Sequence, residues 1–254
     1  MKNWNGTNQP KFIDRTGEIY LTSSGDSMEI VEYFCRRNCS VLFPDGTIVK
    51  NVQYSNIKTG MISNPNTPSL FKVGYMGQGK YDSKSKSYKL WSSIIERCYS
   101  NRIHDLFPTY KECSVVKEWH NFQNFARWFE DNYNEKTMIG WQIDKDILLK
   151  GNKIYSKETC CFVPNSINSL IINRRLHRGD YPLGVSRTKD GRLIAQLNYN
   201  KPRYLGSFKT VEEAFQTYKN AKEKYIIEVA NEWKDLITES TYKALINYKI
   251  EITD

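Results

Sequence analysis

Three side chains along residues 192–198 have the chemistry needed to recognise nucleic-acid bases. Arg192, Gln196 and Asn198 are separated by even numbers of residues. A guanidinium can donate two hydrogen bonds to guanine, and a carboxamide can pair with adenine. Residues an even number apart on a β-strand point to the same face, so the spacing predicts a strand with one base-reading face. Its opposite face is apolar and should pack on a core: Leu193, Ala195 and Leu197.

Further basic residues surround this strand. Those suited to phosphate neutralisation are Arg187, Lys189, Lys201 and Arg203, and a basic connector upstream adds Arg174, Arg175 and Arg178. Between Lys145 and Tyr225 there are 16 Lys and Arg against 7 Asp and Glu, which accounts for the whole net charge of +9. Such segregation favours a polyanionic partner. A solvated basic sheet face that binds no nucleic acid remains the alternative.

The strand belongs to a predicted three-stranded sheet followed by a helix. The first strand opens at Gly184-Val185, and the third includes residues 203–208. Thr210 and Glu213 form a capping box for a helix that runs to about Trp233. A last short helix and a strand-like tail at residues 250–252 complete the prediction.

The upstream sequence predicts the other elements. Residues 141–149 and 154–164 indicate two strands joined by a loop, and residues 165–174 indicate a helix, which together make a ββα unit. Two stripes at helical spacing predict buried helices: Tyr88 to Cys98, and Trp119 to Tyr133. Residues 17–62 predict four or five short strands with a turn at Pro44-Asp45-Gly46, and residues 64–86 predict a linker.

Residues 181–221 resemble the Apetala-two, or ethylene-response-factor, type of DNA-binding domain. The likeness rests on Gly184-Val185, Ala195, Leu205-Gly206 with Phe208, Thr210, Glu212-Glu213-Ala214, Tyr218 and Ala221. The resemblance implies a three-stranded antiparallel sheet packed on one helix, with its exposed face in the DNA major groove. The chain departs from that family where several arginines and tryptophans stand, so the target sequence cannot be carried over.

Residues 87–175 resemble a phage branch of the HNH (His-Me finger) endonucleases. The likeness rests on Trp91, Arg97-Cys98-Tyr99, Glu118-Trp119, Phe122, Phe125, Ile143-Asp144-Lys145, Gly151-Asn152, Tyr155-Ser156, Glu158 and Cys160. It implies one divalent metal held by the ββα unit and a base that activates water against a phosphodiester. In that branch an Asp stands at the end of the first strand, where other members have a His.

This second resemblance assigns a candidate catalytic set. Asp144 and Asp146 would bind Mg²⁺ or another divalent metal through carboxylate oxygens, and Asn168 lies on the helix where a further ligand would sit. Thr159 occupies the place of the family's central Asn, and no His lies within the unit. Asp144-Lys145-Asp146 could equally be a salt-bridged turn in a catalytically inactive scaffold.

Composition narrows the classes of protein to which this chain could belong. The chain has 254 residues, 39% of them apolar, and no run long enough to span a bilayer. No signal-peptide core is present at the start, so we expect a cytoplasmic protein, in the host cytoplasm if it is phage-encoded. Six scattered cysteines indicate reduced thiols rather than a structural zinc site.

The sequence therefore predicts an α+β protein with three domains. They are a small barrel-like β domain of the SH3 or Tudor kind with its linker (residues 1–80), an HNH-like domain (81–178) and an Apetala-two-like domain with a helical extension (179–254). The expected partner is double-stranded DNA, bound with sequence preference and cleaved if the HNH-like unit is active, as in a homing endonuclease. The alternatives are an inactive phage accessory or regulatory protein that acts on nucleic acid or on host anti-phage machinery, and RNA binding.

Overall fold

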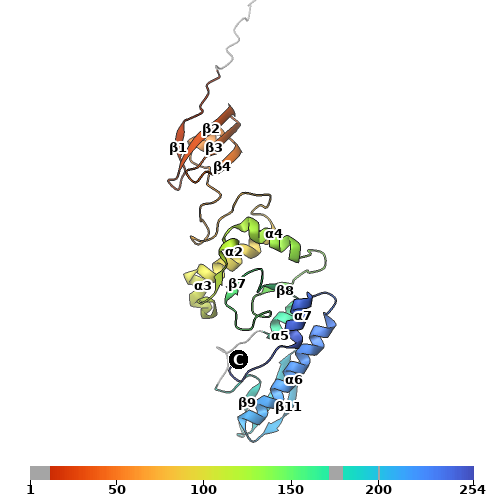
Figure 1. Ribbon diagram of the computed structural model, residues 1–254. Helices are drawn as coiled ribbons and strands as arrows, with labels where there is room; N and C mark the ends of the chain where they lie inside the picture. The colour runs from red at the N-terminus through yellow and green to blue at the C-terminus, as the bar shows by residue number, and fades with distance from the viewer. Residues whose placement is uncertain (1–11, 172–179, 200) are drawn as a thin grey trace, which may run out of the picture. The chain divides into compact units, whose positions relative to one another are not determined.

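A computed structural model describes residues 12–171, 180–199 and 201–254, without the side chain of Lys201 (Figure 1). Runs of strands and runs of helices make a mixed α+β arrangement, as the sequence predicts. The chain divides into two compact units. The first spans Met1–Tyr81 with Asn121–Gln123, and the second contains the rest. None of the described helices is both long enough and apolar enough to cross a membrane.

The first unit is built on a four-stranded antiparallel meander in the order β1-β2-β3-β4. Its elements are β1 (Ile19–Leu21), β2 (Ser27–Cys35), β3 (Asn38–Leu42), β4 (Ile48–Val52) and the short helix α1 (Tyr54–Lys58). Asp45 fixes the β3–β4 turn because its carboxylate accepts the Thr47 amide at 3.0 Å. Gly46 takes the left-handed conformation there, with φ +84°. The predicted strands and hairpin are confirmed.

The prediction of a barrel is wrong. In the described part of the chain β1 pairs only with β2 and β4 only with β3, so the sheet stays open. Its core lies on one face and consists of eight buried residues: Met28, Ile30, Cys39, Val41, Phe43, Val52, Ile57 and Ile62. With nine residues in β2 but three in β1, the outer strand is too short to curl around and meet β4.

The segment predicted as a linker is held in place within the first unit. The Phe122 amide donates to Tyr75 O at 2.9 Å. The Gln123 side chain donates to Met76 O and Tyr81 O, and accepts from the Tyr81 amide. A Cβ at Gly77 would lie 2.0 Å from Asn121, so this glycine permits the close approach.

The second unit begins with an aromatic helical layer. Its elements are α2 (Lys86–Tyr99), α3 (Asn101–Leu106), η1 (Pro108–Tyr110), η2 (Lys117–His120) and α4 (Phe122–Asn132), whose first two residues belong to the first unit. Both predicted stripes are buried, apart from the half-buried Tyr88 and Leu90 of the first, and the Trp91 indole donates to Trp119 O at 2.6 Å. Phe162 joins this layer, with its ring 5.2 Å from that of Trp128.

Four short strands and a helix follow: β5 (Ser114–Val115), β6 (Gln142–Asp144), β7 (Ile154–Tyr155), β8 (Cys161–Val163) and α5 (Asn165–Ile171). β6 pairs antiparallel with β8, and β5 pairs parallel with β7. The order β6, β8 and α5 agrees with the predicted ββα order, but the predicted second strand is divided, since β7 pairs with β5 and only β8 pairs with β6. The first strand ends at Asp144 rather than at residue 149.

The last part contains β9 (Val185–Arg187), β10 (Leu193–Tyr199), β11 (Lys201–Phe208), α6 (Val211–Glu232) and α7 (Glu239–Ile246). The sheet order is β11-β10-β9, and α6 runs across one face (Figure 1). Thr210 and Glu213 form the predicted capping box. Gly184, with φ +76°, lies so close to α6 that a Cβ would come within 2.0 Å of the Tyr218 ring.

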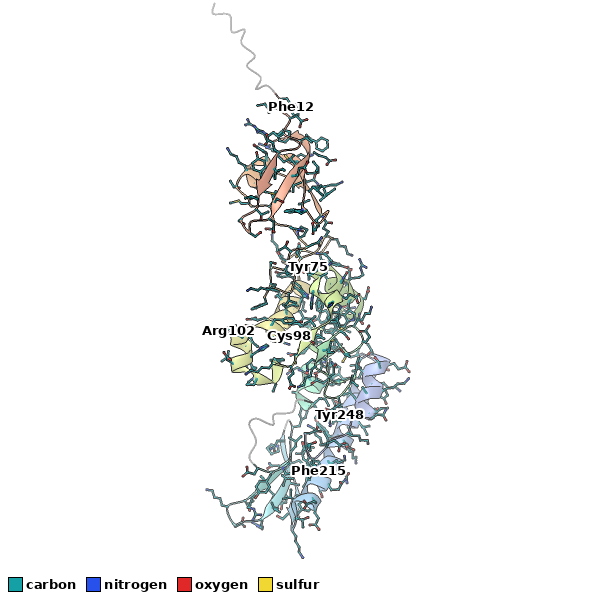
Figure 2. The ribbon with its side chains drawn as sticks, turned by 60° about the vertical axis from the view of Figure 1, so that its left-hand side comes forward. Phe12, Tyr75, Cys98, Arg102, Phe215 and Tyr248 are labelled. Carbon is teal, nitrogen blue, oxygen red and sulfur yellow. The ribbon has the colours of Figure 1, made fainter. Side chains whose placement is uncertain are left out.

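One hydrophobic cluster connects this sheet with the ββα elements. It includes Ile147, Val163 and Ile167 together with Leu193, Ala195 and Phe215, whose ring comes from α6 (Figure 2). The expected domain boundary at 178/179 falls at the edge of residues 172–179, which the structure does not describe. The described residues on both sides of it belong to the same compact unit.

Residues 250–252 form no strand, so the prediction of a strand-like tail is wrong. Instead the Ile250 amide donates to Glu223 and its carbonyl accepts from Lys219.

All six cysteines are free thiols, and all except Cys35 are buried.

Lys222 on the buried face of α6 makes stability depend on pH. It is 7% exposed, and burial lowers its pKa to about 8. The folded protein binds this proton less readily than the unfolded chain does, so stability is lost as pH falls through about 8. We expect Lys222→Met to raise the free energy of unfolding at pH 7 by up to about 3 kcal/mol, and far less near pH 10.5.

Urea unfolding at both pH values measures this effect. Lys224→Met is the matched control, because Lys224 is exposed on the same helix and should change little at either pH. Equal effects of the two substitutions at pH 7 would contradict the assignment.

Candidate nucleic-acid interface and ββα site

The C-terminal sheet has one buried and one exposed face, as the alternation in β10 predicts. Leu193, Ala195 and Leu197 are at most 6% exposed and pack towards α6. Directly paired residues on neighbouring antiparallel strands share a face. The register therefore assigns seven residues to what we term the exposed sheet face: Ser186, Ile194, Gln196, Asn198, Pro202, Tyr204 and Ser207.

A β-bulge in β11 shapes this face. The pairing shifts between Ala195, opposite Gly206, and Gln196, opposite Tyr204, which leaves Leu205 as the extra residue. Leu205 packs on the core side. The bulge brings Tyr204 and Ser207 to the same face although they are three residues apart, and their hydroxyl groups lie 2.8 Å apart.

The described basic residues of this part lie at the β9–β10 turn and on the side of the sheet opposite to the exposed sheet face. Lys189 and Arg192 are exposed at the β9–β10 turn, where Arg192 Nε donates to Asp190 at 2.7 Å. Arg187 pairs with Leu193, and Arg203 with Leu197, so the register puts both on the side that α6 covers, at the sheet edges.

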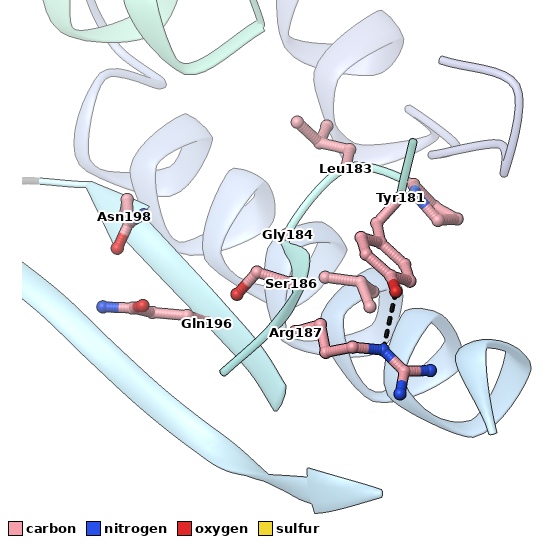
Figure 3. A pocket seen from close by; sticks show the side chains of 9 residues that line it. Tyr181, Leu183, Gly184, Ser186, Arg187, Gln196 and Asn198 are labelled. Atoms are coloured by element: carbon pink, nitrogen blue, oxygen red, sulfur yellow. Dashed lines mark hydrogen bonds between the residues drawn. The ribbon is translucent and has the colours of Figure 1, made fainter. Parts of the chain in front are cut away.

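Arg187 is also engaged locally: its Nε donates to the Tyr181 hydroxyl at 2.7 Å (Figure 3). Three predicted phosphate contacts, Arg174, Arg175 and Arg178, lie outside the described residues, as does the side chain of Lys201. Their predicted contribution to the interface stays a prediction.

A hollow of about 430 Å³ borders the exposed sheet face along β9 and β10. It is lined by residues 181–187 together with Gln196 and Asn198. Figure 3 shows Ser186, Gln196 and Asn198 on one side of β9, and Tyr181 with Arg187 on the other. The alternation along β10 indicates the two amides but not the hollow, because Tyr181 and Leu183, which also line it, precede the sheet.

In the ββα site (β6, β8, α5 and the loop between the strands), Asp144 ends β6. Its Oδ1 accepts the amides of Asp146 and Ile147, each at 2.8 Å. Burial raises the pKa of Asp144, and the neighbouring charge of Asp146 raises it further. A carboxylate with a raised pKa is a better proton acceptor, as a general base requires.

Asp146 is partly neutralised by Lys145. The Lys145 ammonium, on a side chain only 11% exposed, lies 2.8 Å from Asp146 Oδ1. Burial alone would lower the pKa of Lys145, but the hydrogen bond and charge of Asp146 outweigh it and raise the pKa. The salt-bridged turn that sequence analysis left open is therefore present.

The Asn152 side chain holds the loop between β6 and β8 closed, and we call this contact the loop clasp. The HNH resemblance would give this role to the residue at position 159. Asn152 Nδ2 donates to Lys145 O at 2.8 Å and to Ile154 O at 2.7 Å, while its Oδ1 accepts the Ile154 amide. Thr159 reinforces the same turn through a hydroxyl bond to Ile154 O. The Gly151-Asn152 pair could have revealed this role, because an Asn after a glycine turn suits such a clasp.

Asn168 is half-buried on α5, and its side chain makes no hydrogen bond to another described residue. The described histidines are engaged elsewhere: His104 with Arg97 O and His120 with Val115 O, each at 3.1 Å. His177 lies outside the described residues.

The final residues lie against the ββα loop. Lys150 Nζ donates to Lys249 O at 2.7 Å and to Asp254 at 2.6 Å, and it lies 5.4 Å from the centre of the Tyr248 ring. Burial raises the pKa of Tyr248, labelled in Figure 2, and the carboxylates of Asp254, Asp146 and Asp144 add to this.

Asp144 and Asp146 are the carboxylates that would hold the divalent metal implied by the HNH resemblance. Mg²⁺ is commonly held by one or two carboxylates and completes its shell with water or phosphate oxygens. Asp144 and Asp146 meet that minimum in number, and the Lys145 ammonium already occupies Oδ1 of Asp146. Among the described residues no group of three His, Cys, Asp or Glu side chains is arranged to hold a metal.

Comparisons of this chain with protein-family models, with curated proteins and with solved structures found no match. The two resemblances noted from the sequence therefore stay predictions.

We expect Asn152→Ala to weaken the ββα loop selectively. Three hydrogen bonds are lost, so the free energy of unfolding should fall by about 1–3 kcal/mol. Hydrogen exchange at the Ile154 amide should accelerate, because its acceptor is removed. Asn168→Ala is the control and should leave both quantities nearly unchanged. Unaltered exchange at Ile154 in the Asn152 variant would show that the clasp does not hold the loop.

Proposed function

We propose that this protein binds double-stranded DNA through the exposed sheet face and the basic residues around it. The observation that carries the proposal is the position of Gln196 and Asn198, two amides on a rigid strand beside an open hollow. Lys189 and Arg192, at the adjacent turn, are placed to meet phosphates or a guanine at the margin.

The fold supports this use of the sheet. The apolar face of β10 and the capped helix α6 hold the strand by burial, so its outward side chains are presented on a fixed frame. Because binding to the phosphate backbone is electrostatic, the net charge of +9 favours association with any DNA. The amides would then add preference among sequences.

Metal-dependent strand cleavage is a second candidate function, and the position of Asp144 favours it. Asp144 ends the first strand of the ββα site, and its pKa is raised. In this proposal Asp144 and Asp146 hold the ion, and Asp144 also takes the proton of an attacking water. A bound divalent ion would supply charge neutralisation at the phosphoryl oxygens.

Salt titration tests the electrostatic part of the proposal. If five or six phosphates are neutralised, log affinity should fall against log salt concentration with a slope of about −4 to −6. Arg192→Ala or Gln196→Ala should cost about 1–3 kcal/mol and relax base preference. Lys224→Ala removes one charge from α6 on the other side of the sheet and should leave base preference intact. A flat salt response would refute phosphate binding.

Cleavage of plasmid DNA with Mg²⁺ or Mn²⁺ tests the second candidate. Asp144→Asn and Asp144→Ala should abolish cutting, whereas Glu158→Gln, which removes an exposed carboxylate of the same unit, should retain it. Cutting that persists without Asp144 excludes its role. DNA binding without any cutting favours the non-enzymatic accessory function.

A further inference from the structure

The exposed sheet face is polar and aromatic, but it carries little charge of its own. Its register rows are Ser186–Ile194–Ser207, then Gln196–Tyr204, then Asn198–Pro202. Tyr204 is 61% exposed, and its hydroxyl lies 2.8 Å from Ser207 Oγ. An aromatic ring is thus held open to solvent on the outer face of a sheet.

The positively charged side chains do not lie on the part of the sheet face that carries the Tyr204 ring. Lys189 and Arg192 lie at the turn that ends the sheet, and Arg187 and Arg203 belong to the opposite side by register. Phosphates attracted by these groups would therefore run along the margins. The centre of the face is left for contacts with uncharged, planar groups.

The two amides next to the ring are available for such contacts. Neither Gln196 nor Asn198 uses its side chain in a hydrogen bond to another described residue. Gln196 stands directly across from Tyr204, on β10, and the hollow opens on its other side, towards β9. A planar group on the Tyr204 ring would present its edge to an amide donor and acceptor.

Base pairing in a duplex hides these two features of a nucleobase. Its ring faces are covered by stacking, and its Watson–Crick edge is covered by its partner. Aromatic side chains next to amides suit bases that are unpaired, which can stack on the ring and bond through that edge.

We propose that the exposed sheet face receives an unpaired nucleobase of bound DNA, stacked on Tyr204 with its edge read by Gln196. The hollow lined by Ser186, Gln196 and Asn198 gives room to the adjacent nucleotide. This inference rests on the proposed DNA binding and specifies its substrate as DNA that is locally opened or carries an unpaired base.

Fluorescence anisotropy with three DNAs of one sequence tests the inference. They are a fully paired duplex, the same duplex with one extra unpaired nucleotide, and the single strand. Stacking of one base on an aromatic side chain contributes enough for about tenfold in affinity. We therefore expect the duplex with the unpaired nucleotide to bind about tenfold more tightly than the paired duplex.

Substitutions at Tyr204 assign this preference to the ring. Tyr204→Phe keeps the stacking surface and loses only the bond to Ser207, so it should retain the tenfold preference. Tyr204→Leu keeps an apolar residue on the strand but removes the ring, so the preference should vanish. Because Tyr204 lies outside the buried cluster, both variants should unfold at nearly the temperature of the original protein. A preference that survives Tyr204→Leu would overturn the proposal.

The results with the three DNAs distinguish a failure of the proposed DNA binding from a failure of the inference about an unpaired base. If none of the DNAs binds at low salt, the proposed DNA binding itself is wrong. If the paired duplex binds as tightly as the duplex with the unpaired nucleotide, only the inference about an unpaired base is wrong. If the single strand matches the duplex with the unpaired nucleotide, the inference holds and a single strand is sufficient to supply the base.

Discussion

Burial of one face of α6 is the constraint on which the second unit depends. Ala214, Phe215 and Tyr218 cover the underside of the C-terminal sheet, while Ile226 and Val229 continue the same stripe towards the other helices. The helix contacts all three strands of the sheet as well as α5 and α7. A single rigid rod of 22 residues thus sets where the sheet stands relative to the ββα elements.

The same helix limits how far the candidate site can move. Glu223 on α6 accepts the Ile250 amide, and Lys150 of the ββα loop binds Lys249 O, just before Ile250, and Asp254, at the end of the tail. The loop is thereby connected to α6 through a short run of hydrogen bonds. These are only a few hydrogen bonds, whereas the buried stripe runs along the helix, so the stripe supplies most of the rigidity.

Local chemistry explains which features could be predicted from the sequence. The alternation in β10, the Thr210–Glu213 cap and the Pro44–Gly46 turn depend on neighbours within a few residues, and all three are present. The burial of both helical stripes follows from the same kind of periodicity.

Features that depend on distant pairing were missed. The sides taken by Arg187 and Arg203 follow from register and from the bulge at Leu205, which no single strand encodes. The open N-terminal sheet depends on whether β1 meets β4, and the position of residues 250–252 depends on Glu223 and Lys219. Asn152 belongs to the stretch that resembles the HNH family, but its role as a clasp depends on the folded loop, which brings it to Lys145 and Ile154.

The distribution of thiols has a practical consequence. Burial raises the pKa values of Cys39, Cys98, Cys113, Cys160 and Cys161, and the thiolate is the form that attacks electrophiles. Cys35, at the end of β2, is the exposed exception. A maleimide dye should therefore attach to the native protein at one position without mutagenesis. Such a label would report on tumbling of the N-terminal sheet while leaving the second unit chemically untouched.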